Sequence, residues 1–358
     1  MSPDESGTSL AAKSPTVAVI IPTKDRPVFL EEAITSALDQ THAPLEVVVV
    51  DDGSTLPVDG TGLRDRYGPK VRVLRNDKSR GLAFSRNRGV EESDAEYVIH
   101  LDDDDLLAPE AIERCLDVLR RFTDVEWVMF GAVGFGPRAE HFNHVQPDGV
   151  ARVISLARGD SVPGDIVLFD RQLFSALLET VPVAFQRAMV SRQTWSRVCE
   201  LRWVAYRAAE SLPDTESAKA KITGPLRDSE WARYAAIACR RFALVDRPLY
   251  LQRCEGQGYS SLPENRQLHA DQSLAMLETL YRASYSVEQI RDWGPEIRKA
   301  LAQAYFDFAY ARSVAGSQRQ AWAFLRRAAT TRADWRQLRL AARIVSNSLR
   351  PPKPSRAP

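Results

Sequence analysis

Short apolar runs alternate with segments of helical spacing over the N-terminal third of the chain. The apolar runs are rich in β-branched residues, which favours buried strands, and they stop at Pro or at charged residues. They cover residues 17–21, 46–50, 71–74 and 97–101, and the helical segments between and after them cover 29–38, 63–67, 83–92 and 109–122. This alternation predicts an α/β fold, with a mixed, mostly parallel sheet flanked by helices.

The pattern loosens after residue 125. Strands are predicted at 126–133 and 150–154, and helices at 165–179, 188–198 and 230–240. A last strand at 244–251 contains Pro248, which cannot donate a ladder hydrogen bond. We therefore expect an edge strand there.

Strand signals vanish from about residue 263, where Ala, Leu, Arg and Gln dominate. Helices are predicted at 268–285, 287–313, 319–329 and 334–348, which indicates an all-helical C-terminal domain. The predicted organisation is a disordered lead-in (1–15), an α/β domain (16–262), a helical domain (263–348) and a disordered tail (349–358).

Composition narrows the class of protein. The 358 residues carry a formal net charge of +1, so no global field attracts the chain to nucleic acid. The four cysteines show no CxxC spacing and are expected as free thiols in a reducing compartment. No apolar run reaches the length of a membrane span, and the N-terminus lacks a hydrophobic signal core. We expect a cytoplasmic protein.

Charge is nonetheless uneven, because arginines dominate the last helices. Two interpretations remain open for them. They line a helix face that meets anionic lipid at the inner face of the membrane, or they form an ordinary solvated face. The arginines concerned are Arg326, Arg327, Arg336, Arg339 and Arg343.

Polar clusters follow three of the four predicted N-terminal strands. They are residues 22–26, 51–54 and 102–105, the last being four consecutive aspartates. Because the ends of parallel strands share one edge of a sheet, these clusters should converge on one crevice. Four adjacent carboxylates repel one another, so a divalent cation, Mn or Mg, is a natural partner. The alternative is a solvated acidic loop.

Five motifs, taken in order, make the chain resemble the family-2 glycosyltransferases with a GT-A fold. The likeness is close over residues 16–122 and sparse over 123–262. The motifs are Val19-Ile20-Ile21-Pro22-Thr23-Lys24-Asp25-Arg26, Leu38-x-Gln40-Thr41, Glu46-Val47-Val48-Val49-Val50-Asp51-Asp52-Gly53-Ser54, Gly81-x-Ala83-x-x-Arg86-Asn87-x-Gly89 and Tyr97-Val98-Ile99-His100-Leu101-Asp102-Asp103-Asp104-Asp105-x-x-x-Pro109.

The resemblance implies that a sugar moves from a nucleotide-diphosphate donor to an acceptor hydroxyl, with inversion at the anomeric centre. Residues 16–122 would bind the donor, and residues 123–262 would supply the acceptor side. By the match, Asp103 meets the ribose and Asp104 the metal, with Asp102 and Asp105 in support. The remaining donor-binding residues implied are Pro22, Thr23, Asp25, Arg26, Asp52, Arg86 and Arg253.

Several of these assignments have a plain alternative. Asp52 would accept hydrogen bonds from the nucleotide base, or it caps the turn with Ser54. Where the family often has an aromatic residue that stacks on the base, this chain has Lys24. Arg86 and Arg253 would bind phosphate, or they are ordinary surface arginines.

An inverting transfer needs a carboxylate that takes the acceptor's proton. The acidic pair that the family uses corresponds here to Arg227-Asp228. Asp228 is therefore the candidate base and Glu230 the runner-up. Asp228 also suits the N-cap of the helix that follows, which is the structural alternative.

Two rival functions stay open. One is a catalytically inactive nucleotide-sugar-binding or scaffold protein, which the altered pair at Asp228 motivates. The other is a nucleotidyltransferase, which would normally carry a Gly-rich phosphate loop after the first strand, where this chain has no Gly. The acceptor could be a saccharide, a lipid-linked molecule or a small molecule. The sugar, the base and the oligomeric state are left undetermined.

Overall fold

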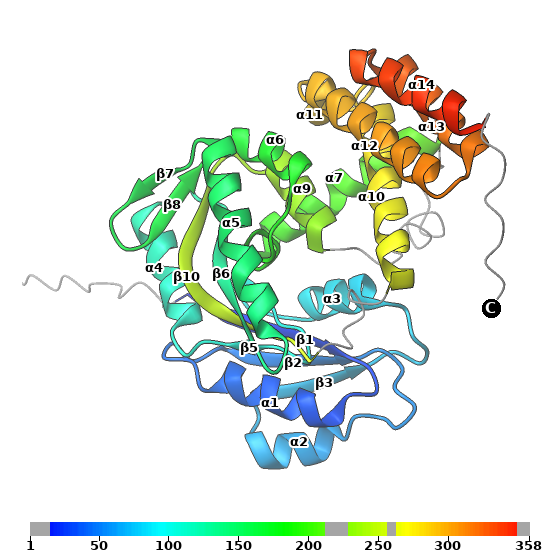
Figure 1. Ribbon diagram of the computed structural model, residues 1–358. Helices are drawn as coiled ribbons and strands as arrows, with labels where there is room; N and C mark the ends of the chain where they lie inside the picture. The colour runs from blue at the N-terminus through cyan, green and yellow to red at the C-terminus, as the bar shows by residue number, and fades with distance from the viewer. Residues whose placement is uncertain (1–14, 212–227, 256–262, 349–358) are drawn as a thin grey trace, which may run out of the picture.

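The computed structural model describes residues 15–211, 228–255 and 263–348. Its strands form one sheet, and helices cover both faces of that sheet (Figure 1). The first elements are β1 (Val17–Thr23), α1 (Pro27–Leu38), β2 (Glu46–Asp51), α2 (Gly60–Tyr67), β3 (Val71–Arg75), α3 (Leu82–Glu91), β4 (Tyr97–His100), β5 (Leu106–Leu107) and α4 (Ala111–Arg121). The strand–helix alternation predicted for this region is confirmed.

The N-terminal strands pair in parallel in the order β3-β2-β1-β4. Successive side chains of β1 point to opposite faces, as the period of a strand requires. Val19 and Ile21 pack with α1, α2 and α4, whereas Ala18 and Ile20 pack with α3 and the helices of the second half. Both faces are therefore covered, which explains why this strand is apolar at every position.

The second half of the sheet is mixed. Its elements are β6 (Trp127–Phe135), α5 (Ala139–Ala157), β7 (Asp160–Val162), β8 (Ile166–Phe169), α6 (Gln172–Glu179), η1 (Val183–Gln186), β9 (Ala188–Ser191), α7 (Arg192–Glu210), α9 (Asp228–Ala238) and β10 (Phe242–Arg253). Strand β9 runs antiparallel to both β4 and β6 and so joins the two halves.

Four local expectations were wrong in this half. Residues 166–169 and 188–191, which fell in predicted helices, are strands β8 and β9, and helices α6 and α7 begin only at Gln172 and Arg192. Residues 150–154, expected as a strand, are the last turns of α5, because Val153 and Ala157 place a narrow apolar stripe on an otherwise polar helix. Pro248 does not mark an edge strand. Strand β10 lies inside the sheet between β6 and β8, and Pro248 sits where its register with β6 shifts. At such an irregularity the missing N–H breaks no regular ladder.

The C-terminal helices were predicted correctly as a class. They are α10 (Pro263–Ala283), α11 (Glu288–Arg291), α12 (Gly294–Val314), α13 (Gln318–Thr331) and α14 (Trp335–Ser348). Helix α10 packs on α7 and shares its apolar core, while α13 and α14 enclose a small cluster of their own with α12. Among the helices of the described ranges, none is both long and apolar enough to cross a bilayer.

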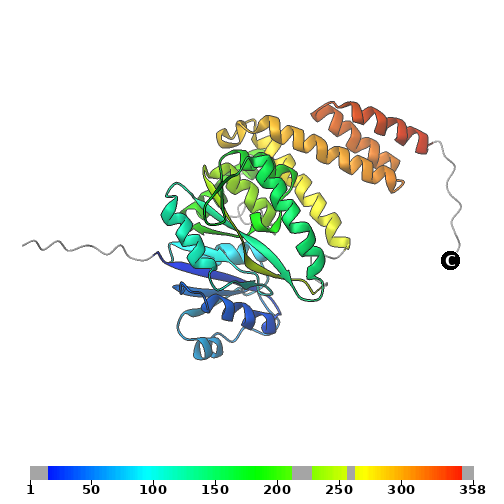
Figure 2. The ribbon, with the colours of Figure 1, turned by 60° about the vertical axis from the view of Figure 1, so that its left-hand side comes forward.

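The observed class is an α/β fold with a mixed, mostly parallel sheet and a helical C-terminal region, as expected. Figure 2 shows α13 and α14 projecting from the sheet-bearing body at the end opposite to β1 and α2. The boundary at residue 262 remains a prediction, since α10 shares its core with the α/β part.

Candidate active site

The three polar clusters meet at one edge of the sheet, because β1, β2 and β4 are parallel neighbours. The hydroxyl of Thr23 donates to Oδ2 of Asp103 at 2.7 Å. The backbone N–H of Asp52 donates to the carbonyl of Thr23 at 2.9 Å. The predicted convergence of these strand ends is thus observed, with Thr23 at its centre.

Arg26 is the positive charge closest to the middle of the aspartate run. Its Nη1 lies 3.2 Å from Oδ1 of Asp103 and 2.6 Å from Oδ2 of Asp104. About two fifths of the Arg26 side chain is exposed. This arginine therefore bridges two carboxylates from the open side of the site.

Asp102 is held by two buried arginines from distant parts of the chain. Arg86, on α3, donates to Oδ1 at 2.6 Å, and Arg187, just before β9, donates to Oδ2 at 2.9 Å. The guanidinium of Arg187 also lies over the ring of Tyr250, 4.6 Å from its centroid. The two arginines fix the carboxylate on the inner side of the site.

Asp105 is buried and faces β10. It accepts from the hydroxyl of Tyr250 at 2.7 Å and from the backbone N–H of Arg253 at 2.8 Å. Burial raises the pKa of Asp105 to about 7, against the opposing charge of Arg187. Asp105 therefore ties the aspartate run to β10, the supporting position that the resemblance implied.

The middle aspartates are also perturbed. Burial raises the pKa of Asp103 to about 6, although Thr23 and Arg26 act in the opposite direction. Burial and the charge of Asp102 raise the pKa of Asp104. The crowded carboxylates are thus incompletely neutralised by the arginines, and additional positive charge would stabilise their ionised form.

These residues fit a hard divalent cation. The available atoms are carboxylate oxygens, the ligands that Mn and Mg prefer, and the side chain of Asp104 is 30% exposed. Asp102 fits less well as a ligand, since each of its oxygens already accepts from an arginine. In the described ranges no three Asp, Glu, His or Cys side chains converge to enclose an ion, so phosphate or water oxygens would have to complete its shell.

Asp52 is buried and satisfied within the protein. Its Oδ1 accepts from Nδ2 of Asn76, the hydroxyl of Ser85 and the N–H of Arg80, and its Oδ2 accepts from the hydroxyl of Ser79 and the N–H of Gly81. Burial alone would raise the pKa of this carboxyl, but these donors lower it. Asp52 therefore shapes the loop before α3, and its contact with a nucleotide base stays a prediction.

The loop after β1 is joined to the loop after β2. The N–H of Asp25 donates to the hydroxyl of Ser54 at 3.0 Å, and the N–H of Thr55 donates to Oδ1 of Asp25 at 2.7 Å. Asp25 has a positive φ of 57°, which Asp tolerates better than most residues. Pro22 is buried at the end of β1. Together these contacts form one wall beside the aspartate run.

Arg253 is packed against the aspartate run and is largely buried. Its Nε donates to the carbonyl of Asp104 at 2.8 Å, and its guanidinium pairs with Glu32 and Glu255. The rings of Phe29 and Phe135 lie on either side, 4.6 and 4.7 Å from the guanidinium carbon. The structure therefore makes Arg253 a support of the site, and phosphate binding by it stays a prediction.

The two candidate bases differ in how much the structure describes. Asp228 is the first residue of α9, and its side chain lies outside the described residues. Glu230 is buried, and its Oε1 accepts from Nε of Arg202 at 3.1 Å and from the hydroxyl of Tyr206 at 3.2 Å. Glu230 is thus already an ion-pair partner in the core.

Arg187 and Tyr250 contact the aspartate run but were not among the predicted site residues. Arg187 contacts Asp102, which is 85 residues away in the sequence, and Tyr250 contacts Asp105, which is 145 residues away. No local motif could have linked residues so far apart. Arg187 also lines a small recess together with Arg86, His100, Trp195 and Trp231. The rings of Trp195 and Trp231 stack there with centroids 3.9 Å apart.

Comparison with known proteins agrees with this geometry. Residues 18–166 match the model of glycosyl transferase family 2. The chain is 37% identical over 111 residues to a chondroitin synthase of Escherichia coli, covering 30% of this chain and 16% of that protein. It is 32% identical over 111 residues to a putative teichuronic acid biosynthesis glycosyltransferase, TuaG, of Bacillus subtilis, covering 29% and 42%. The chain spans less than half the length of these relatives.

Solved structures give the fold. The crystal structure of Staphylococcus aureus TarS, residues 1–349, superposes with a TM-score of 0.52 at 14% identity, covering 93% of this chain and 88% of that one. The same TarS fragment in complex with UDP-GlcNAc has a TM-score of 0.52 at 16% identity, covering 93% and 89%. The fold is of the GT-A type, and within it residues 18–166 are similar to glycosyl transferase family 2.

Proposed function

We propose that the protein is a metal-dependent, inverting glycosyltransferase that moves a sugar, most simply a hexose, from a nucleotide-diphosphate sugar to an acceptor hydroxyl. The observation that carries the proposal is the aspartate run at the end of β4, joined to Thr23 at the end of β1, to Arg26 in the loop that follows and to two buried arginines. Such a strand end is where open α/β sheets bind nucleotides.

The donor's diphosphate needs positive charge, and the site can supply it from two sources. Asp104, supported by Asp102, would hold a Mn or Mg ion, whose Lewis acidity would stabilise the diphosphate leaving group. Arg26 is half-exposed on the open side of the same carboxylates, where it could contact a phosphate oxygen once a cation replaces it. Arg86 and Arg187 hold the carboxylate of Asp102 in place.

The nucleoside would lie along the wall formed by the loops after β1 and β2. Thr23, Asp25 and Pro22 form this wall, and Asp103, which accepts from the hydroxyl of Thr23, would meet the ribose. Asp52 would act mainly through the loop that it holds before α3. TarS has been crystallised with UDP and with UDP-GlcNAc, which makes a uridine nucleotide the first donor to test.

The acceptor's proton would go to Asp228. The acceptor oxygen forms a bond to the anomeric carbon, the bond to the diphosphate oxygen breaks with its electron pair, and a carboxylate takes the hydroxyl proton. Glu230 suits this role less well because Arg202 and Tyr206 already occupy its oxygen. We therefore keep Asp228 as the base and Glu230 as the alternative.

Turnover of nucleotide sugars tests the proposal. The wild type with Mn or Mg should release nucleoside diphosphate from one donor, faster with a suitable acceptor, and Asp228→Asn should lower kcat by about 10²–10⁴-fold. Glu230→Gln is the matched comparison. Donor binding without turnover in any donor–acceptor pair would favour the inactive scaffold, which the replaced acidic pair at residues 227–228 motivates.

A further inference from the structure

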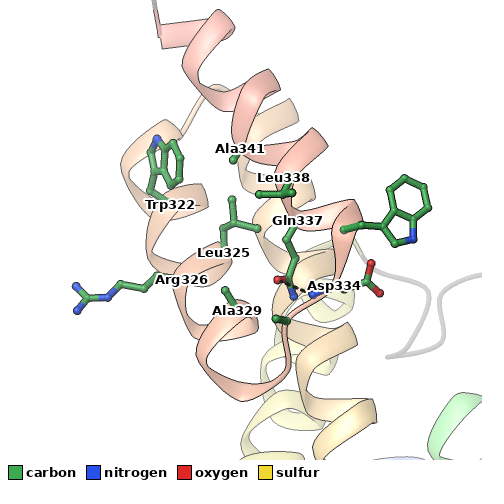
Figure 3. A pocket seen from close by; sticks show the side chains of 10 residues that line it. Trp322, Leu325, Arg326, Ala329, Asp334, Gln337, Leu338 and Ala341 are labelled. Atoms are coloured by element: carbon green, nitrogen blue, oxygen red, sulfur yellow. Dashed lines mark hydrogen bonds between the residues drawn. The ribbon is translucent and has the colours of Figure 1, made fainter.

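Helices α13 and α14 present an apolar surface at the far end of the molecule. Figure 3 shows this surface between the two helices, with Trp322 and Leu325 on α13 and Leu338 and Ala341 on α14; Trp335 also lines it. We call this surface the α13–α14 face and define it by Trp322, Leu325, Ala329, Trp335, Leu338 and Ala341. Nothing in the proposed transfer reaction uses it.

Three apolar side chains of this face, Trp322, Trp335 and Leu338, protrude into solvent. Leu338 is 74% exposed, Trp335 61% and Trp322 41%. The core between these helices does not need the exposed side chains, because it is already formed by Leu325, Leu340 and Ile344 together with Ala309 and Ala321. The exposed residues therefore form a surplus apolar patch, the usual mark of an interaction surface.

The polar groups around the groove are largely used within the helices. Nε2 of Gln337 donates to the carbonyl of Arg332 at 2.9 Å, and its Oε1 accepts from the N–H of Asp334 at 3.1 Å. The carboxylate of Asp334 pairs with Arg336. Apart from its arginines, the groove offers few donors and acceptors to a saccharide, which needs many, so it suits an occupant with an apolar part.

The same two helices carry a strong positive charge. Residues 318–348 hold seven arginines and one acid, Asp334. Arg327 pairs with Glu278 and Arg336 with Asp334. In the described part of the chain, no carboxylate lies within 4.0 Å of the other five, which are Arg319, Arg326, Arg332, Arg339 and Arg343. Two of these arginines lie at the groove itself: Arg326 lines it, and the guanidinium of Arg339 lies over the ring of Trp335, 4.5 Å from its centroid. An occupant of this face should therefore be anionic as well as apolar.

A second copy of the chain fits these requirements poorly, because two identical basic faces would repel each other. A lipid surface fits them well. Exposed Trp and Leu side chains insert at the boundary between headgroups and acyl chains, while arginines extend to anionic headgroups. We propose that the α13–α14 face docks the protein on a membrane surface rich in anionic lipid.

The position of the face permits docking without blocking the site. Helices α13 and α14 lie at the end opposite to β1, β2 and α2 in both views of the molecule (Figures 1 and 2). The aspartate run would remain open to solvent and to its donor. This inference does not depend on the proposed transfer reaction.

Sedimentation of the full chain with vesicles tests the proposal. The probes are phosphatidylcholine vesicles with and without phosphatidylglycerol. We expect binding to the anionic vesicles that weakens as salt is raised, and little binding to the neutral ones. Absence of binding to the anionic vesicles, or equal binding to both kinds, would overturn the proposal.

Paired variants separate the apolar and the charged contributions. Leu338→Gln combined with Trp335→Ala should lower the vesicle partition coefficient by about tenfold, whereas the exposed Leu56→Gln should leave it unchanged. Arg326→Gln with Arg339→Gln should lower it by a similar factor of about ten, whereas Arg64→Gln with Arg158→Gln, also exposed and without a carboxylate partner, should not.

Unchanged melting temperatures would show that the variants are folded. Equal losses in the matched controls would contradict the assignment to this face. Light scattering measures the oligomeric state. If the wild type is a dimer and Leu338→Gln is a monomer, the face binds a second copy of the chain instead of a membrane.

Discussion

Individual arginines determine how the aspartate run is presented. Asp102 is paired with Arg86 and Arg187, whereas Asp103 and Asp104 share Arg26. The first two arginines are buried and fixed, but Arg26 reaches in from a loop and is partly exposed. The carboxylate of Asp102 is therefore fixed, whereas those of Asp103 and Asp104 pair with an arginine that another cation can displace.

Replacing Arg26 should make the site bind a metal ion more tightly in the absence of nucleotide. Arg26→Gln removes a cation that competes for Asp103 and Asp104, and we expect Mn affinity to rise by about tenfold. Titration followed by electron paramagnetic resonance of free Mn measures this directly. Arg66→Gln, which breaks a surface pair with Glu31, is the control. Weaker Mn binding in Arg26→Gln would show that Arg26 supports the metal instead of competing with it.

Asp52 should contribute to stability in a pH-dependent way. Its pKa is lowered in the folded state, so its stabilising effect is present above the ordinary Asp pKa of about 4 and is lost as pH falls through the folded value. Asp52→Asn leaves the N–H groups of Arg80 and Gly81 without a carboxylate partner. We expect the free energy of unfolding at pH 7 to fall by about 1–3 kcal/mol.

Denaturant unfolding at several pH values measures this effect. The difference between the wild type and Asp52→Asn should shrink below about pH 4, because the wild-type carboxyl then gains a proton as well. A difference that stays constant from pH 7 to pH 3 would mean that the charge of Asp52 is not what holds the loop.

At the scale of elements, the site depends on how closely α3 approaches β1. A Cβ placed on Gly89 would lie 2.3 Å from Cγ2 of Ile20 and 3.3 Å from Cγ2 of Val50. Helix α3 carries Arg86 one turn before Gly89, so the same close packing positions Arg86 against Asp102. The close packing of α3 against β1 explains why Arg86 and Gly89 occur together in one motif.

Gly89→Ala should therefore destabilise the protein, although Ala is the better helix former. We expect the overpacking to cost about 1–3 kcal/mol, more than the gain in helix propensity of about 1 kcal/mol. Gly294→Ala, at the start of α12 with its nearest neighbour 3.8 Å from the added Cβ, is the control and should be neutral or slightly stabilising. A stable Gly89→Ala with unchanged melting would contradict the close approach.

The sequence was most informative where local chemistry alone decides structure. Strands β1 and β2 are apolar at nearly every position because both of their faces are buried, and so their positions could be predicted. The prediction of a strand at residues 150–154 was wrong because a short apolar stripe, taken without the rest of α5, resembles a strand. Pro248 misled because a register shift inside the sheet accommodates it as well as an edge would.

The candidate site could likewise be predicted only in part from the sequence. The aspartate run and Thr23 could be found because they are local motifs at strand ends. The pairing of Asp102 with Arg187 could not, because the two residues meet only after β9 joins the two halves of the sheet. Nor does sequence reveal that Asp52 and Glu230 are already saturated by partners inside the protein.

At the scale of the whole molecule, the fold separates two surfaces. The aspartate run follows β4 in the sheet, and the α13–α14 face lies at the end of the molecule away from β1, β2 and α2 (Figure 1). Helix α10 connects them through its packing on α7. A cytoplasmic location and the identity of the acceptor remain predictions that this arrangement accommodates.

The central claim is that the aspartate run binds a nucleoside diphosphate together with a metal ion. Thermal unfolding of the full chain in a panel of nucleoside diphosphates, with and without Mn, tests it most directly. One nucleotide at about 100 times its Kd should stabilise the wild type by about 2.7 kcal/mol in the presence of Mn and clearly less without it. Asp104→Asn should lose the Mn-dependent part of the stabilisation. No shift with any nucleotide, or an equal shift in Asp104→Asn, would contradict the claim.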